Sequence, residues 1–259
     1  MRNIVNLNQD WIFIKNTTDV NAREGEKINL PHSWNAIDGQ DGGNDYFRGS
    51  CLYTKTLTKA DLPPADLYYL EFRGTNSSAD LFVNGNKLAH HDGGYSTWRV
   101  NITDAITEQT DIAVIVDNAP CDTVYPQMAD FTFYGGIYRN VNLICVSNAH
   151  FDLDYYGAPG LKITPAINGT SASVEVEAFV KNLTDGQKLV YAIYDKDENE
   201  LQKIETTETK VVFEIENVHL WNGRKDPYLY CCEIELVEGD KVLDNVCNQS
   251  GCMQGLLMC

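Results

Sequence analysis

Apolar and polar residues alternate with a period of two along much of this chain. Short runs rich in β-branched and aromatic residues are bounded by Gly, Asn, Asp or Pro, as strands require, and they include residues 67–72, 79–83 and 111–116. No window of about 12 residues or more repeats apolar side chains at the i, i+3, i+4, i+7 spacing of a helix. We therefore predict an all-β protein whose helices are few and short.

The step Asn84-Gly85 separates two such runs. Asn and Gly both tolerate the positive φ angles that a type I′ turn demands at its two central residues. We expect a β-hairpin with a two-residue turn at this point.

From Phe151 onward, the candidate strands are more evenly spaced and are separated by turn signals such as Thr184-Asp185-Gly186. These candidate strands are residues 173–180, 188–194, 201–207, 209–215 and 228–237. Such regular repetition is typical of a small immunoglobulin-like sandwich. Four acidic residues in this half alternate with apolar ones and predict the solvated face of an antiparallel sheet: Glu175, Glu177, Glu214 and Glu216.

The charge of the chain excludes two classes of partner. Its 259 residues include 20 Lys+Arg and 37 Asp+Glu, which gives a formal net charge of −17 at pH 7. Because such a surface repels phosphate backbones and anionic lipids, we expect no nucleic-acid partner and no membrane partner, whereas neutral sugars remain open. The N-terminal residues carry no apolar secretory signal, and no stretch reaches the ~18 apolar residues of a membrane span, so a cytoplasmic location is expected.

The eight cysteines form no C-x-x-C pair and no zinc-ligand cluster with histidines. We interpret the cysteines as buried thiols and expect no metal and no cofactor. His32 and His91 lie beside turn residues. We interpret both as loop histidines with satisfied hydrogen bonds rather than as ligands.

Four turn-like segments of the first half combine aromatic residues, glycines and single polar residues: 30–35, 44–49, 90–95 and 130–139. A sugar site needs such residues, because sugar C–H groups pack on aromatic rings and carboxylates accept hydrogen bonds from hydroxyls. Composition alone does not distinguish a sugar site from aromatic residues of a core.

The order and the amino-acid sequences of these segments resemble those of the N-terminal part of glycoside hydrolase family 2, which contains β-galactosidases, β-glucuronidases and β-mannosidases. The motifs that carry the resemblance span most of the chain: Leu7–Phe13, Pro31–Asn35, Tyr46–Gly49, Phe82–Gly85, His91–Tyr95, Asp130–Arg139, Leu220–Gly223 and Pro227–Tyr230. The sequence of Asp130–Arg139 looks most like the matching segment of bacterial β-galactosidases.

The resemblance implies a jelly-roll sugar-binding domain over residues 1–149 and an Ig-like sandwich over 150–247. Residues 248–259 form an atypical tail that matches no closing strand of the family's second domain. In the family, the two catalytic glutamates lie in a following (β/α)₈ barrel, which needs about 250 further residues. The Asn-Glu-Pro of the family is also missing, because Asn199-Glu200 is followed by Leu201. We therefore expect a non-catalytic N-terminal fragment with no catalytic residue of its own.

Two substrate-binding residues are implied by the resemblance. In the family, an aspartate at the start of the 130–139 segment reaches the hydroxyls of the terminal sugar, and here that position is Asp130. An upstream asparagine helps in some members, and Asn44 is the nearest candidate. The alternatives are a loop-capping carboxylate for Asp130 and an ordinary turn residue for Asn44. We interpret Arg48 and Arg139 as scaffold charges that pair with neighbouring carboxylates.

Three functions are compatible with these residues. The first is a fragment of a β-galactosidase-like hydrolase, which meets a β-galactoside-like carbohydrate in the context of a full-length enzyme. The second is a self-sufficient carbohydrate-binding module with exposed aromatic residues such as Trp34 or Trp98, and the third is a purely structural assembly domain. An incomplete last strand would leave an exposed sheet edge. Because such an edge can pair with a second copy of the chain, a homo-oligomer is a possible state.

Overall fold

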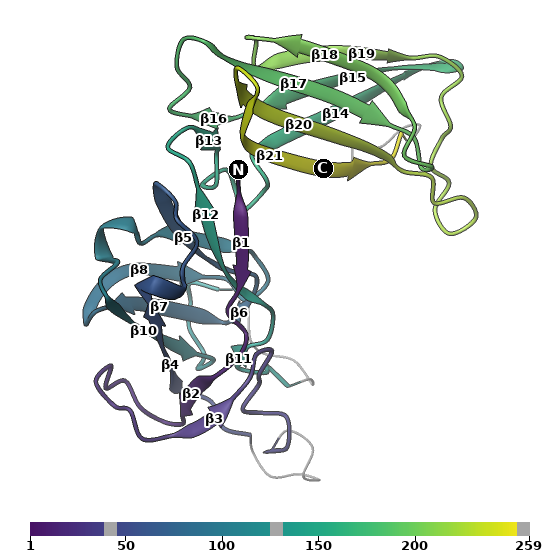
Figure 1. Ribbon diagram of the computed structural model, residues 1–259. Coiled ribbons are helices and arrows are strands. Elements are labelled where there is room, and N and C mark those ends of the chain that lie inside the picture. The colour runs from purple at the N-terminus through teal and green to yellow at the C-terminus, as the bar shows by residue number, and fades with distance from the viewer. Residues whose placement is uncertain (39–45, 125–131, 253–259) are drawn as a thin grey trace. The chain divides into compact units, whose positions relative to one another are not determined.

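A computed structural model describes residues 1–38, 46–124 and 132–252 of the chain. The chain divides into two compact units, one formed by Asn3–Cys145 and one by Met1–Arg2 together with the residues from Val146 onward (Figure 1). Strands build both units, and the helices whose full extent is described are the short 3₁₀ turns η2 (Lys59–Asp61) and η3 (Thr103–Ala105). The all-β prediction is confirmed. No helix in the described part is long and apolar enough to cross a membrane.

The first unit is a jelly-roll sandwich of two main sheets. One sheet has the strand order β3-β2-β4-β10-β7-β8 and the other has the order β1-β12-β5-β9. The six strands of the first sheet are β2 (Trp11–Ile14), β3 (Glu26–Ile28), β4 (Ser50–Thr58), β7 (Ser78–Val83), β8 (Asn86–Asp92) and β10 (Gln109–Asp117). The four of the second are β1 (Asn3–Asn6), β5 (Leu67–Phe72), β9 (Trp98–Asn101) and β12 (Val141–Val146). A short pair, β6 (Thr75–Asn76) and β11 (Gly136–Ile137), lies beside them.

The core of the first unit lies between these two sheets. Alternate residues of each strand face inward, and they are the residues of a single buried cluster. That cluster joins Tyr53 and Val114 of the six-stranded sheet to Leu70, Phe72 and Leu143 of the four-stranded sheet. The period-two pattern of the sequence therefore marks the faces that pack against each other.

The predicted hairpin is confirmed. Strands β7 and β8 are antiparallel, and Asn84-Gly85 joins them with φ angles of 49° and 79°. Both angles are positive, as a type I′ turn requires.

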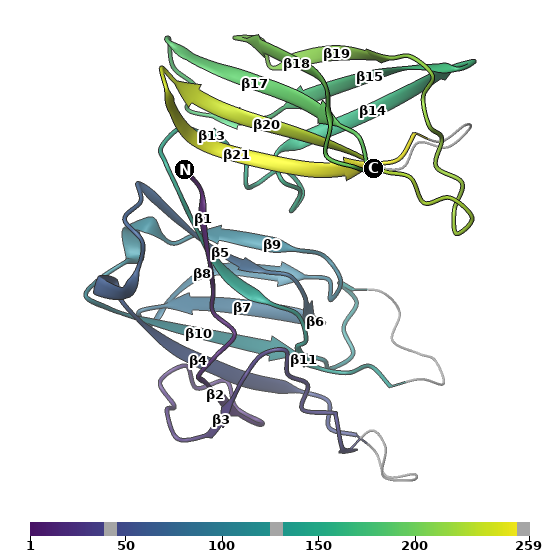
Figure 2. The ribbon, with the colours of Figure 1, turned by 45° about the vertical axis from the view of Figure 1, so that its right-hand side comes forward.

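The second unit is an Ig-like sandwich of a three-stranded sheet, β14-β15-β19, and a four-stranded sheet, β18-β17-β20-β21 (Figure 2). The strands are β14 (Leu161–Asn168), β15 (Ser171–Ala178), β17 (Gln187–Tyr194), β18 (Glu200–Thr206), β19 (Lys210–Ile215), β20 (Tyr230–Glu238) and β21 (Lys241–Ser250). A small pair, β13 (His150–Phe151) and β16 (Val180–Lys181), completes the unit. Its apolar core lies between the two sheets.

Strand β14 was not among the predicted strands. Its residue Pro165 interrupts the pattern, because proline cannot donate a hydrogen bond to a sheet. The strand order places β14 at an edge of its sheet, where one side of the backbone needs no partner. Proline is tolerated there, and the strand forms.

One buried ion pair ties the first two residues of the chain into the second unit. The Arg2 guanidinium donates to both carboxylate oxygens of Asp244, at 3.0 and 2.9 Å. The backbone N–H of Phe151 donates to the same carboxylate at 2.8 Å. The Asp244 side chain has no exposed surface, so its charge depends on these partners.

The prediction that all cysteines are buried thiols is wrong for three of them. Cys231 of β20 and Cys247 of β21 form a disulfide, and Cys121 is exposed. The error arises because Cys231 and Cys247 face outward on neighbouring strands, and their 16-residue separation spans a hairpin that the sequence analysis did not identify. Four other described cysteines are buried thiols, as predicted: Cys51, Cys145, Cys232 and Cys252.

Candidate functional site

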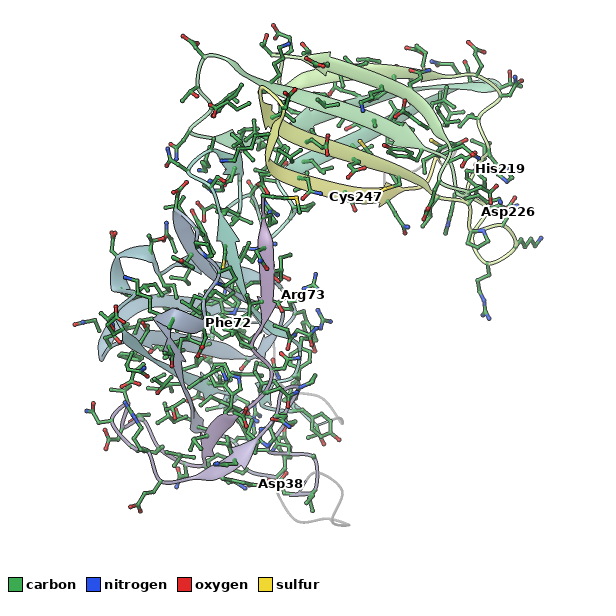
Figure 3. All side chains as sticks on the ribbon, viewed as in Figure 1. Asp38, Phe72, Arg73, His219, Asp226 and Cys247 are labelled. Carbon is green, nitrogen blue, oxygen red and sulfur yellow. A yellow bond between two sulfur atoms is a disulfide. The ribbon has the colours of Figure 1, made fainter. Side chains whose placement is uncertain are left out.

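The two residues expected to contact sugar, Asn44 and Asp130, lie outside the described residues. The structure does describe the residues that flank residues 39–45 and 125–131 on both sides. Figure 3 shows Asp38, the last described residue before the first of these segments, at one end of the first unit. The geometry of these flanking residues defines the candidate site.

The residues on either side of segment 39–45 are joined to each other. The Asn35 amide donates to Asp38 Oδ1 at 3.1 Å and to the carbonyl of Phe47 at 2.9 Å. The backbone N–H of Phe47 donates to Asp38 Oδ2 at 3.1 Å. Lys15 Nζ lies 3.6 Å from the same Asp38 oxygen. The base of this segment is therefore closed by hydrogen bonds to one amide and one carboxylate.

The residues that flank segment 125–131 join the same network. The Asn118 amide donates to the carbonyl of Phe133 at 2.9 Å and to Asn35 Oδ1 at 3.1 Å. Asn35 Oδ1 also accepts from the N–H of Gly135 at 2.7 Å. The N–H of Phe133 donates to the Tyr46 hydroxyl at 3.0 Å. Asn35 and Asn118 are both fully buried, so the bases of the two segments share one solvent-excluded network.

Close packing fixes this network in place. A Cβ atom at Gly135 would lie 2.0 Å from the ring of Trp34, so only glycine fits there. The Arg48 guanidinium lies 5.2 Å from the ring centre of Phe133 and donates to the carbonyl of Asn118 at 2.9 Å. Aromatic rings and a cation thus surround the buried amides.

Both histidines are hydrogen-bonded, as expected, but only His32 lies in a loop, because His91 belongs to strand β8. His32 Nδ1 shares a hydrogen bond of 2.8 Å with the Tyr53 hydroxyl. Burial lowers the pKa of His32, against a smaller opposing effect of the Glu26 charge. His91 Nε2 lies 3.0 Å from the carbonyl of Gly93 and 3.1 Å from Ser96 Oγ.

Two other expectations are wrong. Arg139 has no carboxylate partner among the described residues, because its guanidinium faces the carbonyls of Arg73 and Tyr95, at 3.4 and 3.3 Å. Trp34 and Trp98 are not exposed aromatics, since each is only 7% exposed and belongs to the core of the first unit. A carbohydrate-binding module that uses these two rings is therefore excluded.

Asn35 and Asn118 organise the site, and neither was predicted from the sequence to do so. Asn35 closes a motif that was noted for its aromatic residue, and Asn118 follows the strand that ends at Asp117. The available signal was the position of each amide at the base of a long turn-like segment, but burial of the amides could not be read from it. Within the described ranges, no three His, Cys, Asp or Glu side chains are grouped so that they could hold a metal ion.

Comparisons with known proteins identify the relatives of this chain. Residues 157–252 match the profile of the glycosyl hydrolases of family 2. A crystal structure of an FMN-binding β-glucuronidase from Facaelibacterium prausnitzii L2-6 is 35% identical and superposes on 97% of this chain with a TM-score of 0.89. The β-glucuronidase of Bacteroides fragilis is 29% identical over 95% of the chain. The β-galactosidase of Thermoanaerobacter pseudethanolicus is 26% identical over 96% of it.

The relatives are much longer than this chain. The chain spans 37% of the Bacteroides protein, 35% of the Thermoanaerobacter protein and 39% of the crystallised one. Both β units lie within the region that the crystallised relative covers. The resemblance of this chain to the N-terminal region of glycoside hydrolase family 2 is therefore confirmed.

Proposed function

We propose that this chain is the non-catalytic sugar-contacting part of a family 2 glycosidase. In this proposal, the first unit presents Asp130 and Asn44 to the terminal sugar of a substrate whose bond is cleaved by carboxylates outside the chain. Retaining hydrolysis needs two carboxyl groups about 5–5.5 Å apart on either side of that bond. The relatives that carry out such reactions are more than twice as long as this chain, which supports a division of labour.

One observation supports the proposal more than any other. The bases of segments 39–45 and 125–131 are hydrogen-bonded to the same buried pair, Asn35 and Asn118. Two segments that begin from one rigid base can present their side chains to one ligand, because little conformational freedom is lost when the ligand binds.

We propose a β-galactoside as the substrate, because the sequence of Asp130–Arg139 resembles that of bacterial β-galactosidases. The relatives include proteins named β-galactosidase and proteins named β-glucuronidase, so a β-glucuronide is the second candidate. The two sugars differ at C6, where one carries a hydroxymethyl group and the other a carboxylate. Substrates of both kinds are needed in any test.

The test uses a chimera in which this chain replaces the matching part of the Bacteroides fragilis β-glucuronidase. Asp130→Ala should lower kcat/KM for the better of the nitrophenyl β-galactoside and β-glucuronide by about 100-fold, because hydroxyl contacts to a charged group are worth about 1.5–3 kcal/mol. Asp122→Ala is the matched control, since Asp122 is an exposed residue near the same segment.

Two results would contradict the proposal. One is an active chimera in which Asp130→Ala behaves like Asp122→Ala. The other is hydrolysis of either nitrophenyl glycoside by the purified 259-residue chain at a rate that a point change within it abolishes.

A further inference from the structure

A concavity of about 510 Å³ opens on the second unit between two edge strands. The strand orders place β14 at the edge of one sheet and β21 at the edge of the other (Figure 2). The concavity is lined by residues of both strands and of the segment that precedes β14. Its volume lies within the range of about 300–1,000 Å³ that is typical of small-ligand sites.

Two tyrosines form an aromatic wall of this concavity. The ring of Tyr155 stacks on Phe179 with 4.0 Å between ring centres, and Tyr156 meets Tyr155 edge to face at 5.1 Å. Tyr156 is 92% exposed and has a φ angle of 47°, in the left-handed region that non-glycine residues rarely adopt. A large ring that is exposed to water on a strained backbone does not stabilise the fold. It is therefore a candidate for contact with a ligand.

The segment that carries these rings is anchored at both ends. The N–H of Asp152 donates to the carbonyl of Phe179 at 2.7 Å, and the N–H of Phe179 donates to the carbonyl of Gly160 at 2.9 Å. Because both anchors involve Phe179, which also stacks on Tyr155, the aromatic wall is organised before any ligand arrives. Preorganisation of this kind reduces the entropy cost of binding.

The polar side chains that line the concavity are available to a ligand and carry no negative charge. Lys162, Asn248 and Gln249 line the concavity, and within the described ranges none of their side chains makes a hydrogen bond or ion pair. Glu177 lies opposite Lys162 across the β14–β15 pair, but Lys210 engages it at 3.6 Å. In a chain with a net charge of −17, a lining with one lysine and no carboxylate is a local exception.

We infer that this concavity binds an acidic oligosaccharide, a sugar chain that bears carboxylates. Its pyranose rings stack on Tyr156 and Tyr155, its hydroxyl groups bond to the amides of Asn248 and Gln249, and a carboxylate pairs with Lys162. The inference does not rest on the proposed function, because it uses none of the residues of the first unit.

The test is a calorimetric titration of the full chain with trigalacturonate as the probe and galactotriose as its uncharged counterpart. Trigalacturonate should bind saturably at millimolar concentration and more weakly as sodium chloride is raised. Tyr156→Ala should weaken its binding about fivefold or more, because an aromatic contact is lost. Lys162→Gln should weaken trigalacturonate binding by a similar factor and leave galactotriose unaffected.

Matched controls are available on exposed surfaces. Tyr95→Ala removes an exposed tyrosine of the first unit, and Lys203→Gln removes an exposed lysine of β18, so neither should change the affinity. Because Tyr156 and Lys162 are exposed, their variants should keep the wild-type unfolding temperature. Asp130→Ala, which tests the proposed function, should also leave trigalacturonate binding unchanged.

Three results would overturn the inference. They are no saturable binding of trigalacturonate, equal binding of galactotriose, and wild-type affinity in Tyr156→Ala. Equal binding of galactotriose would show that the carboxylate is not recognised.

Discussion

The two units bury polar groups in different ways. Among the described residues, nine buried polar or charged side chains belong to the first unit: Asn35, Thr54, Glu71, Thr75, Asn76, Ser77, Thr110, Asn118 and Asn142. Three belong to the second unit: His150, Gln187 and Asp244. A buried polar network is costly unless every member is bonded, and when complete it fixes one geometry. The first unit thus holds segments in position, whereas the second unit relies mainly on apolar packing.

The largest effect should come from the buried Arg2–Asp244 ion pair of the second unit. Arg2→Met leaves the fully buried Asp244 without its cation and should lower the free energy of unfolding of the second unit by about 3–5 kcal/mol. Calorimetry that resolves one transition for each unit measures this change. Lys188→Met is the control, because the Lys188–Glu205 pair is exposed and should contribute far less to stability. Equal effects of the two variants would contradict the prediction.

A slightly smaller loss is expected in the first unit for Asn118→Ala. The change removes the buried amide that donates to Asn35 Oδ1 and to the carbonyl of Phe133, which should cost about 2–4 kcal/mol. The transition of the first unit should move and that of the second should not. Asn21→Ala, at an exposed position of the same unit, should change neither. A shift in both transitions would show that the units do not unfold independently.

Packing around the same network predicts a further loss. Gly135→Ala places a methyl group against the ring of Trp34 and should destabilise the first unit by about 1–3 kcal/mol. In a Trp34→Leu background the same change should cost less, because the obstructing ring is gone. Urea unfolding of the four proteins in this cycle measures the coupling, and strict additivity would argue against the clash.

The smallest effect is a pH dependence of stability, and it is expected in the first unit. His90 Nδ1 lies 2.6 Å from Asp80 and Nε2 lies 3.1 Å from Asp92, and the hydrogen bond to Asp80 raises the pKa of His90. Because the folded pKa is raised, this stabilisation is present below the unfolded pKa of about 6.5 and is lost as pH rises through the folded pKa. Since His90 is half exposed and Lys87 competes for Asp80, the effect should stay below about 0.5 kcal/mol.

Denaturant titrations of wild type and His90→Asn between pH 5 and pH 8 check this prediction. The wild-type first unit should lose its small advantage over the variant across that range. An advantage that grows with pH would contradict the sign.

Sequence periodicity predicted the class of fold because a strand that is buried on one face has apolar residues at every second position. It located β5 and the Asn84-Gly85 turn, where local chemistry decides the conformation. It missed β14, because tolerance of Pro165 depends on which strand lies at the sheet edge, and that is a property of the assembled sheet.

The candidate site was harder to predict than the fold. Asn44 and Asp130 came from family resemblance and stay predictions. Asn35 and Asn118 lie 83 positions apart, and nothing in the neighbourhood of either marks it as buried. Exposure of Tyr156 and burial of Trp34 likewise depend on which layer covers each ring. Long-range contact, rather than local preference, decides these positions.

The Arg2–Asp244 pair has a consequence for how the chain folds during synthesis. The two residues are 242 positions apart, so the arginine is synthesised well before the aspartate with which it pairs. At about 5–20 residues per second, that delay is roughly 10–50 s. The first unit can fold during this time, whereas the second unit also needs Arg2, which precedes the first unit in the sequence. The order of synthesis therefore differs from the order of assembly here, because Arg2 precedes the first unit in the sequence but is part of the second unit.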